Sequence, residues 1–206
     1  MIELLDGSGK VWKGIIDSIC PDSVSVAHLE LIPPSNSSKR MVLVQSLCKA
    51  DKLEWILQKV TELGIAEIRL LEAKRSVVKL PQEKMKNKME RWRKIILGAT
   101  KQSRRSTLPF LHPPALCEAI CKSLETDLKL LLSESAEGTI LKSFLRSSQW
   151  SSVAFCIGPE GGWTAQEEET FVHFGFTPVS LGCNILRTET AAIVATAILM
   201  YELEND

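Results

Sequence analysis

The chain has 206 residues, of which 45% are hydrophobic and 24% charged, so it can build a packed core and global disorder is excluded. Its 25 basic and 25 acidic residues give a net charge of zero. The longest nearly continuous apolar run, 191–201, is too short to span a bilayer, and the N-terminus lacks the pattern of a signal peptide, so we expect a cytoplasmic protein without a membrane partner.

Short strands are predicted in the first 34 residues, at 2–5, 11–17 and 24–31. The turn Asp6-Gly7-Ser8-Gly9 is typical of a hairpin, and the Pro- and Ser-rich segment after residue 32 has the composition of a linker. Three strands are too few to close a barrel. We therefore expect residues 1–34 to form a small β appendage and residues 39–206 to form the main domain.

Strands and helices alternate after the linker, which predicts βαβ units and a mostly parallel sheet. The expected strands are 41–47, 68–71, 128–132, 153–157 and 179–181. The expected helices are 52–63, 81–102, 114–124, 139–146, 164–173 and 188–203, with a capping box formed by Thr164 and Glu167.

Charge is strongly segregated along the chain. Twelve basic residues stand against two acidic ones between residues 74 and 105, a net charge of +10, whereas residues 150–206 carry eight acidic residues and one basic residue, Arg187, a net charge of −7. A basic stretch of this kind fits a polyanion such as nucleic acid, because neutralised phosphates release counterions. From charge alone, a solvated helix face is an equally good interpretation.

Metal and common nucleotide sites find no support in the sequence. The six cysteines form no CxxC pair and the three histidines are scattered, so we predict reduced cysteines and no bound metal. The motifs GxGxxG, GxxxxGK[ST], GxSxG and HExxH are all missing.

Two segments that follow predicted strands could carry chemistry. The first, 157–162, has three glycines and a proline between a strand and a capped helix, so its backbone can approach a ligand closely. The second, 181–191, places Arg187 at a helix entrance. Both would lie at the carboxyl ends of parallel strands, where such sheets bind ligands. A tight turn between strand and helix is the alternative interpretation of each.

The strings IGPEGGWTAQEEE and VSLGCNILRTETAAI resemble the C-terminal signature of the RsmE family of small-subunit rRNA uridine-N3 methyltransferases, in the SPOUT superfamily. DKLEWILQKVTELGI and KQSRRSTLP resemble two further blocks of that family, in the same order. The resemblance implies an α/β SPOUT domain with a C-terminal trefoil knot, preceded by a PUA-like RNA-binding barrel that is truncated here. It also implies S-adenosylmethionine as cofactor, 16S rRNA of the small ribosomal subunit as substrate, and a homodimer.

The resemblance also implies roles for individual residues. Arg75, Lys101, Arg104 and Arg105 would bind RNA; in this family Glu is common at Lys74 and Lys101, and Gly at Arg104. The cofactor-binding residues would be Leu132, Ser133, Glu134, Ile157, Gly158, Pro159, Glu160, Gly161, Gly162, Leu181, Gly182, Ile185, Leu186 and Thr190.

Methylation at uridine N3 requires loss of the N3 proton, so the site must stabilise developing negative charge. Arg187 is the first catalytic candidate, and Arg105, contributed by the partner protomer, is the second. Glu160 and Glu189 are possible bases, although either could instead cap a helix or bind cofactor amides. Small residues in the terminal helix, Ala191, Ala192, Ala195 and Ala197, would permit close helix approach in a dimer.

Two other functions remain open. One is a SPOUT methyltransferase that acts on tRNA, and the other is a non-catalytic RNA-binding α/β protein that keeps the fold. Binding of S-adenosylmethionine separates the second from an enzyme, and the RNA that is methylated separates the first.

Overall fold

The computed structural model describes residues 1–32, 40–134, 136, 141–145 and 150–204. A three-stranded antiparallel sheet comprises β1 (Ile2–Leu5), β2 (Val11–Cys20) and β3 (Ser23–Ile32). A six-stranded parallel sheet comprises β4 (Arg40–Ser46), β5 (Glu67–Leu71), β6 (Phe110–Ala115), β7 (Leu128–Leu132), β8 (Ser152–Ile157) and β9 (Thr177–Val179), in the order β6-β5-β4-β8-β7-β9. The helices are α1 (Ala50–Glu62), α2 (Gln82–Gln102), α3 (Cys117–Lys122), α4 (Leu141–Leu145), α5 (Ala165–His173) and α6 (Thr188–Glu204).

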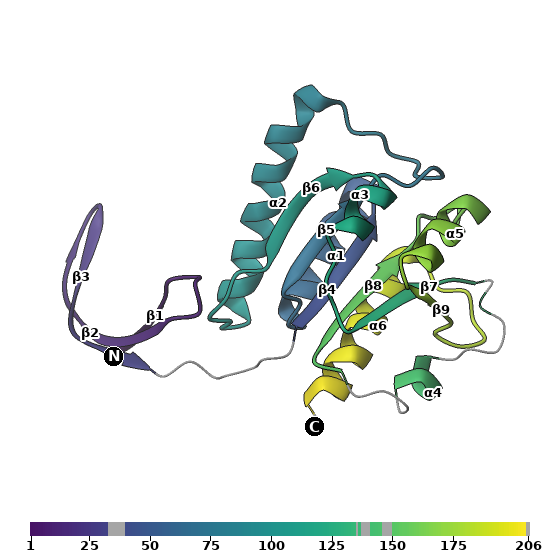
Figure 1. Cartoon of the computed structure of the whole chain (residues 1–206). Coiled ribbons are helices and arrows are strands. Elements are labelled where there is room, and N and C mark those ends of the chain that lie inside the picture. The colour runs from purple at the N-terminus through teal and green to yellow at the C-terminus, as the bar shows by residue number, and fades with distance from the viewer. Residues whose placement is uncertain (33–39, 135, 137–140, 146–149, 205–206) are drawn as a thin grey trace.

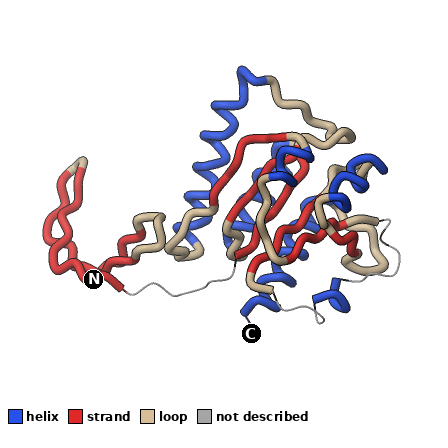
Figure 2. The backbone as a smooth tube through the Cα atoms, in the orientation of Figure 1, coloured by secondary structure: helices blue, strands red, loops and turns tan. Residues whose placement is uncertain are grey.

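Helices cover both faces of the parallel sheet (Figures 1 and 2). Along β4, Met41 and Leu43 pack into a core with α1, α2, α4 and α6, whereas Val42 and Val44 pack into a second core with α3 and α5. Successive side chains of a strand point to opposite faces of the sheet. A strand that is buried on both faces therefore has a continuous run of apolar residues in the sequence. The predicted α/β class with a parallel sheet is confirmed.

One strand was not predicted. The expected helix 114–124 is wrong at its start, because Phe110–Ala115 forms β6 and α3 begins only at Cys117. The prolines Pro113 and Pro114 argue against a central strand, but β6 lies at the edge of the sheet and pairs only with β5. An edge strand tolerates proline because one side of its backbone needs no partner. The last strand also differs, at 177–179 instead of 179–181.

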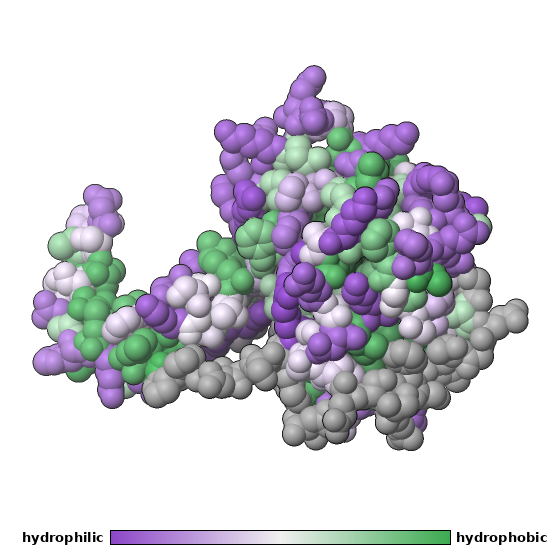
Figure 3. All heavy atoms as spheres, viewed as in Figure 1, coloured by the Kyte–Doolittle hydropathy of each residue, from purple (hydrophilic) through white to green (hydrophobic). Residues whose placement is uncertain are grey.

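The three predicted N-terminal strands are present and form a ribbon beside the main body (Figure 1). Two backbone hydrogen bonds attach it, from Gly9 N–H to Ser106 O (3.1 Å) and from Leu108 N–H to Gly7 O (3.2 Å). Large apolar side chains such as Ile19 are exposed on the ribbon, which shows as green patches in Figure 3. The expected domain boundary near residues 34–39 lies outside the described residues.

The C-terminal end of α2 has an unusual residue. Arg105 N–H donates to Thr100 O (3.1 Å) and Arg104 N–H to Lys101 O (3.3 Å), which is the hydrogen-bond pattern of a Schellman motif. Arg104 occupies the position after the cap residue with φ +56°, where glycine is usual. The left-handed backbone costs a residue with a Cβ about 1–2 kcal/mol.

The terminal helix α6 packs on α1 and on the sheet. Ala192 and Ala195 are fully buried in the core of their own chain, so these two alanines do not serve the close approach of a second protomer that the sequence suggested. Along the described ranges, which end at residue 204, no helix is both long and apolar enough to cross a membrane.

Candidate functional site

A pocket of about 790 Å³ opens at the carboxyl ends of three neighbouring strands. The last residues of β7, β8 and β9, namely Leu132, Ile157 and Val179, all line it. In the sheet, β5 and β6 lie on one side of β4, whereas β7, β8 and β9 lie on its other side. The switch point, where the strand order reverses, is therefore between the neighbouring strands β4 and β8. Ligands of open α/β sheets bind beside such a switch point.

The pocket brings together nearly all of the residues predicted from the sequence. Thirteen of the fourteen predicted cofactor residues line it, and Thr190 does not. Arg187, the first catalytic candidate, also lines it. Cys183, Asn184 and Thr188 also line it and lie within the predicted loop 181–190, whereas the lining residues that sequence reasoning missed as cofactor contacts are Lys52, Arg75, Trp163, Glu168, Val179, Ser180 and Ala191.

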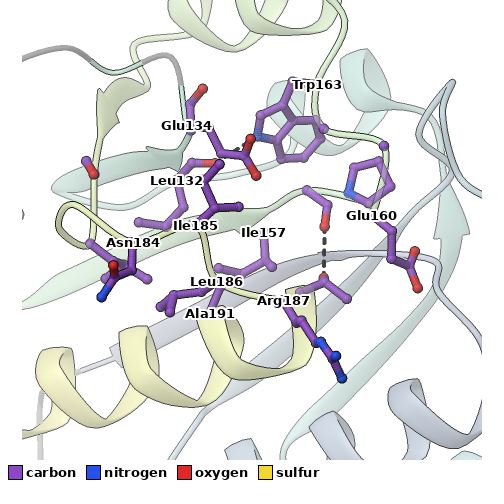
Figure 4. A pocket seen from close by; sticks show the side chains of 18 of the residues that line it. Leu132, Glu134, Ile157, Glu160, Trp163, Asn184, Ile185, Leu186, Arg187 and Ala191 are labelled. Atoms are coloured by element: carbon purple, nitrogen blue, oxygen red, sulfur yellow. Dashed lines mark hydrogen bonds between the residues drawn. The ribbon is translucent and has the colours of Figure 1, made fainter.

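The lining combines apolar and acidic side chains. Leu132, Ile157, Ile185 and Leu186 gather near the start of α6 (Figure 4). Glu134, Glu160 and Glu168 line the same cavity, and Glu168 accepts a hydrogen bond from Ser133 Oγ. Such a lining can hold a flat apolar ring on one side and a cationic group on the other.

Arg75 fixes the glycine-rich loop. Its Nη1 donates to the carbonyls of Gly161 (3.1 Å) and Trp163 (3.0 Å). A Cβ on Gly161 would lie only 3.1 Å from Arg75 Cβ, so the absence of a side chain there allows the close contact. Arg75 was predicted to bind RNA, but the described structure engages its guanidinium in organising the pocket.

A buried carboxylate fixes the other end of the same loop. Thr164 and Glu167 form the predicted capping box of α5, with Glu167 Oε2 accepting from Thr164 N–H (3.0 Å) and Oγ1 (2.7 Å). Glu167 Oε1 also accepts from Lys74 N–H (2.8 Å). Burial acts to raise the pKa of Glu167, but these hydrogen bonds outweigh burial and lower the pKa overall.

Buried polar groups tie the loop to β4 and α6. Thr188 Oγ1 donates to Gly158 O (2.8 Å) and accepts from Gln45 Nε2 (3.1 Å), while Ser46 Oγ donates to Ile157 O (2.8 Å). Gln45 and Ser46 are fully buried. The sequence signal for these contacts was the polar pair at the end of the apolar strand 41–44, which sequence reasoning did not use.

Trp163 closes the wall between β7 and β8. Its Nε1 donates to Leu132 O (2.8 Å), the last carbonyl of β7, and the side chain is 8% exposed. The indole also packs edge-on against Phe171 of α5. The pocket wall is therefore continuous with the core beneath α5.

Lys52, at the start of α1, lies between two carboxylates. Its Nζ is 3.4 Å from Glu160 Oε1 and 3.3 Å from Glu189 Oε2. The contact with Glu189 is the main cause that raises the pKa of Lys52, and the contact with Glu160 adds to it. Of the two candidate bases, Glu160 lines the pocket and Glu189 is buried behind Lys52.

The two candidate catalytic arginines have different surroundings. The Arg187 side chain extends away from the apolar wall in Figure 4, and no other side chain in the described ranges pairs with it. Arg105 does not line this pocket; its Nη1 donates to Thr61 O (2.6 Å) in the last turn of α1, and burial lowers its pKa. A role for Arg105 in the site of a partner protomer stays a prediction.

Lys101 and Arg104, the remaining predicted RNA contacts, are exposed at the end of α2. In the described part of the chain, no three His, Cys, Asp or Glu side chains are grouped as a metal site.

Comparisons with known proteins agree with this geometry. A family model described as an RNA methyltransferase domain matches residues 35–200. Ribosomal RNA small subunit methyltransferase E of Bacillus subtilis is 35% identical over 92% of this chain and 77% of its own length, and that of a Synechocystis strain is 33% identical over 98% and 66%. The chain thus spans about two thirds to three quarters of these relatives.

Solved structures agree as well. Ribosomal RNA small subunit methyltransferase E of Neisseria gonorrhoeae, bound to S-adenosyl methionine, matches with a TM-score of 0.84 and 30% identity over 97% of this chain and 82% of that one. A Legionella pneumophila protein in complex with the bound cofactor SAM matches with a TM-score of 0.85 and 34% identity over 97% and 81%.

We predict that Arg75→Ala loosens the glycine-rich loop without unfolding the domain. Loss of two hydrogen bonds from a charged donor should lower the free energy of unfolding by about 1–2 kcal/mol. Amide hydrogen exchange should speed up at 160–163 while the amides of β4 keep their protection. The exposed Arg93→Ala is the control, and unchanged exchange in the loop of Arg75→Ala would show that the two hydrogen bonds do not fix it.

Proposed function

Because this chain belongs to the family of ribosomal RNA small subunit methyltransferase E, we propose that it transfers a methyl group from S-adenosylmethionine to N3 of a uridine in small-subunit (16S) ribosomal RNA. The observation that carries the proposal is the pocket at the ends of β7, β8 and β9, which gathers thirteen of the fourteen residues predicted to bind this cofactor. Two relatives with similar folds were solved with the cofactor bound.

The pocket residues suit the parts of S-adenosylmethionine. Leu132, Ile157, Ile185 and Leu186 provide an apolar wall for the adenine ring. The backbone of the glycine-rich loop offers hydrogen-bonding groups to adenine and ribose, since no side chain shields Gly158, Gly161 or Gly162. When bound, the cofactor supplies an electrophilic methyl group on a positively charged sulfur, and Glu134 and Glu160 favour that positive charge.

The protein must also promote loss of the uridine N3 proton. Uracil N3 has no available lone pair until the proton leaves, and the resulting negative charge spreads onto the two carbonyl oxygens. Arg187 stabilises this charge because its guanidinium is exposed at the pocket and carries no competing ion pair among the described residues. Glu160, on the same pocket, accepts the proton while Lys52 holds it in place. Arg105 acts as the second arginine if the partner protomer presents it.

The chain path supports a C-terminal trefoil knot of the SPOUT type. After β9, the backbone pairs with the segment that follows β7, through Ser133 N–H to Val179 O (3.1 Å) and Leu141 N–H to Ser180 O (2.9 Å). It then crosses the strand ends and continues into α6, which packs on α1. Part of the chain between β7 and β8 lies outside the described residues. The ribbon β1–β3 would be a partial PUA-like domain, and residues 39–206 the methyltransferase domain.

The direct test is methyl transfer from labelled S-adenosylmethionine to small ribosomal subunits, to naked 16S rRNA and to tRNA, followed by nucleoside mass analysis. The proposal requires 3-methyluridine in 16S rRNA. Methylation of tRNA alone would favour the other SPOUT function, and cofactor-dependent stabilisation without transfer to any RNA would contradict the enzyme assignment. An enzyme of this kind would act in the cytoplasm, where ribosomal subunits are assembled.

Gly182→Val should abolish cofactor binding. Gly182 lines the pocket with φ +137°, a conformation that valine cannot adopt without strain, so the loop must move. Calorimetric titration with S-adenosylmethionine measures the loss. Gly175→Val is the matched control, because Gly175 also has a positive φ (+84°) but does not line the pocket. Equal affinity losses in both variants would mean that strain destabilises the whole domain.

Arg187→Ala should lower turnover by roughly a hundred- to a thousandfold, the typical effect of losing one group that stabilises developing charge. Cofactor affinity should stay within about threefold, because the interaction exists only as N3 loses its proton. Initial rates on small subunits and calorimetric titration measure the two effects. Arg187→Lys should restore part of the rate. A wild-type rate in Arg187→Ala would assign the arginine a purely structural role.

We also propose that the protein is a homodimer that completes the pocket. Ile185 is 76% exposed although it lines the cavity, so the apolar wall stays open on that side in a single chain. A second protomer would cover it. Light scattering at micromolar concentration should give about twice the chain mass of 22.9 kDa, and a monomeric mass would contradict the proposal.

A further inference from the structure

We propose that the second half of α2 and the turn after it form a ridge that binds phosphates of the substrate RNA. The ridge consists of Arg93, Lys94, Lys101 and Arg104, all exposed. This inference rests on the proposed function, since it takes ribosomal RNA as the polyanion. It adds a place where the RNA backbone lies and a reason for an unfavourable residue at the end of α2.

The charges of the ridge are available because nearby acidic residues are missing. No Asp or Glu occurs between residues 91 and 117. Two other arginines of this stretch already have partners in the chain. Arg91 forms an ion pair with Glu54 of α1 (2.6 Å), and the half-buried Arg105 donates to Thr61 O. For the four ridge residues, the described structure shows no ion pair with an acidic side chain.

Helix geometry places Lys94 and Lys101 on one side of α2, with Arg93 about 100° around the helix from Lys94. Lys94 and Lys101 are seven residues apart, which is close to two full turns, so they point in nearly the same direction. Met89, Trp92 and Ile96 are buried on the opposite side. Hydrophilic surface covers much of the visible side of α2 in Figure 3. From Arg93 to Lys101 the helix rises about 12 Å, which is long enough to face several phosphates.

Arg104 provides the second, independent observation. It holds a left-handed conformation (φ +56°) at a position that glycine would occupy without strain. Strained backbone positions are often associated with function. The arginine therefore offers a charged side chain that glycine lacks. This exposed side chain makes no hydrogen bond to the described residues.

The N-terminal ribbon extends the same surface. Gly9 and Gly7 hydrogen-bond to Ser106 and Leu108, directly after Arg104, and the exposed Lys10 follows this contact. A backbone that lies on the ridge would continue toward the ribbon. Phosphates fit this surface because its cations are exposed and form no ion pair with the described acidic residues, so an RNA backbone that binds them can release its counterions.

The test measures binding of naked 16S rRNA by filter retention between 50 and 300 mM salt. In Arg104→Gly, affinity at 150 mM salt should fall several-fold and the log–log salt slope should decrease by about one, while the thermal midpoint stays equal or rises. Arg104→Lys should bind almost as the unchanged protein does. Lys94→Gln with Lys101→Gln should reduce the slope by about two.

The control Lys122→Gln with Lys142→Gln removes the same charge from exposed sites on α3 and α4. If the ridge variants bind RNA with the same affinity and salt slope as this control, the proposal that the ridge binds RNA is overturned. This holds even if the ridge variants lose affinity for an acidic peptide. A lower thermal midpoint in Arg104→Gly would also overturn it, because the arginine would then stabilise the fold. Failure of the proposed function gives a different result, because the unchanged protein would then neither bind 16S rRNA nor methylate it. Cofactor titration does not depend on the ridge.

Discussion

The hydrogen bond from Thr188 Oγ1 to Gly158 O holds the site together. The two residues lie thirty positions apart, one at the start of α6 and one in the glycine-rich loop, and both groups are removed from most solvent. A carbonyl that is shielded from water and lacks a partner is costly, so this bond favours the arrangement in which the loop and the helix entrance are together. The Gln45 amide extends the contact to β4. Pocket shape is thus coupled to the central strands of the sheet and does not depend on the loop alone.

Arginine serves two purposes in this chain, and the groups that each guanidinium contacts separate them. Arg75 and Arg105 donate to backbone carbonyls, of the loop and of α1 respectively, and so act on the architecture. Arg187 and Arg104 are exposed at the pocket and at the end of α2, where a ligand can meet them. A guanidinium can do either because its five donors fit several acceptors at once.

Patterns with local physical causes were predictable from the sequence. Residues close together in the sequence determine three of these features: the apolar strands, the capping box at Thr164, and the position of the glycine-rich segments directly after strands. Contacts between distant segments were not predictable: no local pattern tells that Arg105 reaches Thr61 or that Lys52 reaches Glu189. The strand β6 was missed because its prolines oppose a strand unless the edge position is already known. Likewise, Ala192 and Ala195 of α6 looked like an interface and are core, whereas Ala191 and Ala197 are half-buried.

The prolines of β6 have a consequence for association. Exposed sheet edges invite pairing with strands of other molecules, which leads to aggregation. Pro113 and Pro114 lack N–H groups, so the outer side of β6 cannot offer the continuous ladder that an incoming strand needs. Copies of this chain therefore cannot extend their parallel sheets through the β6 edge.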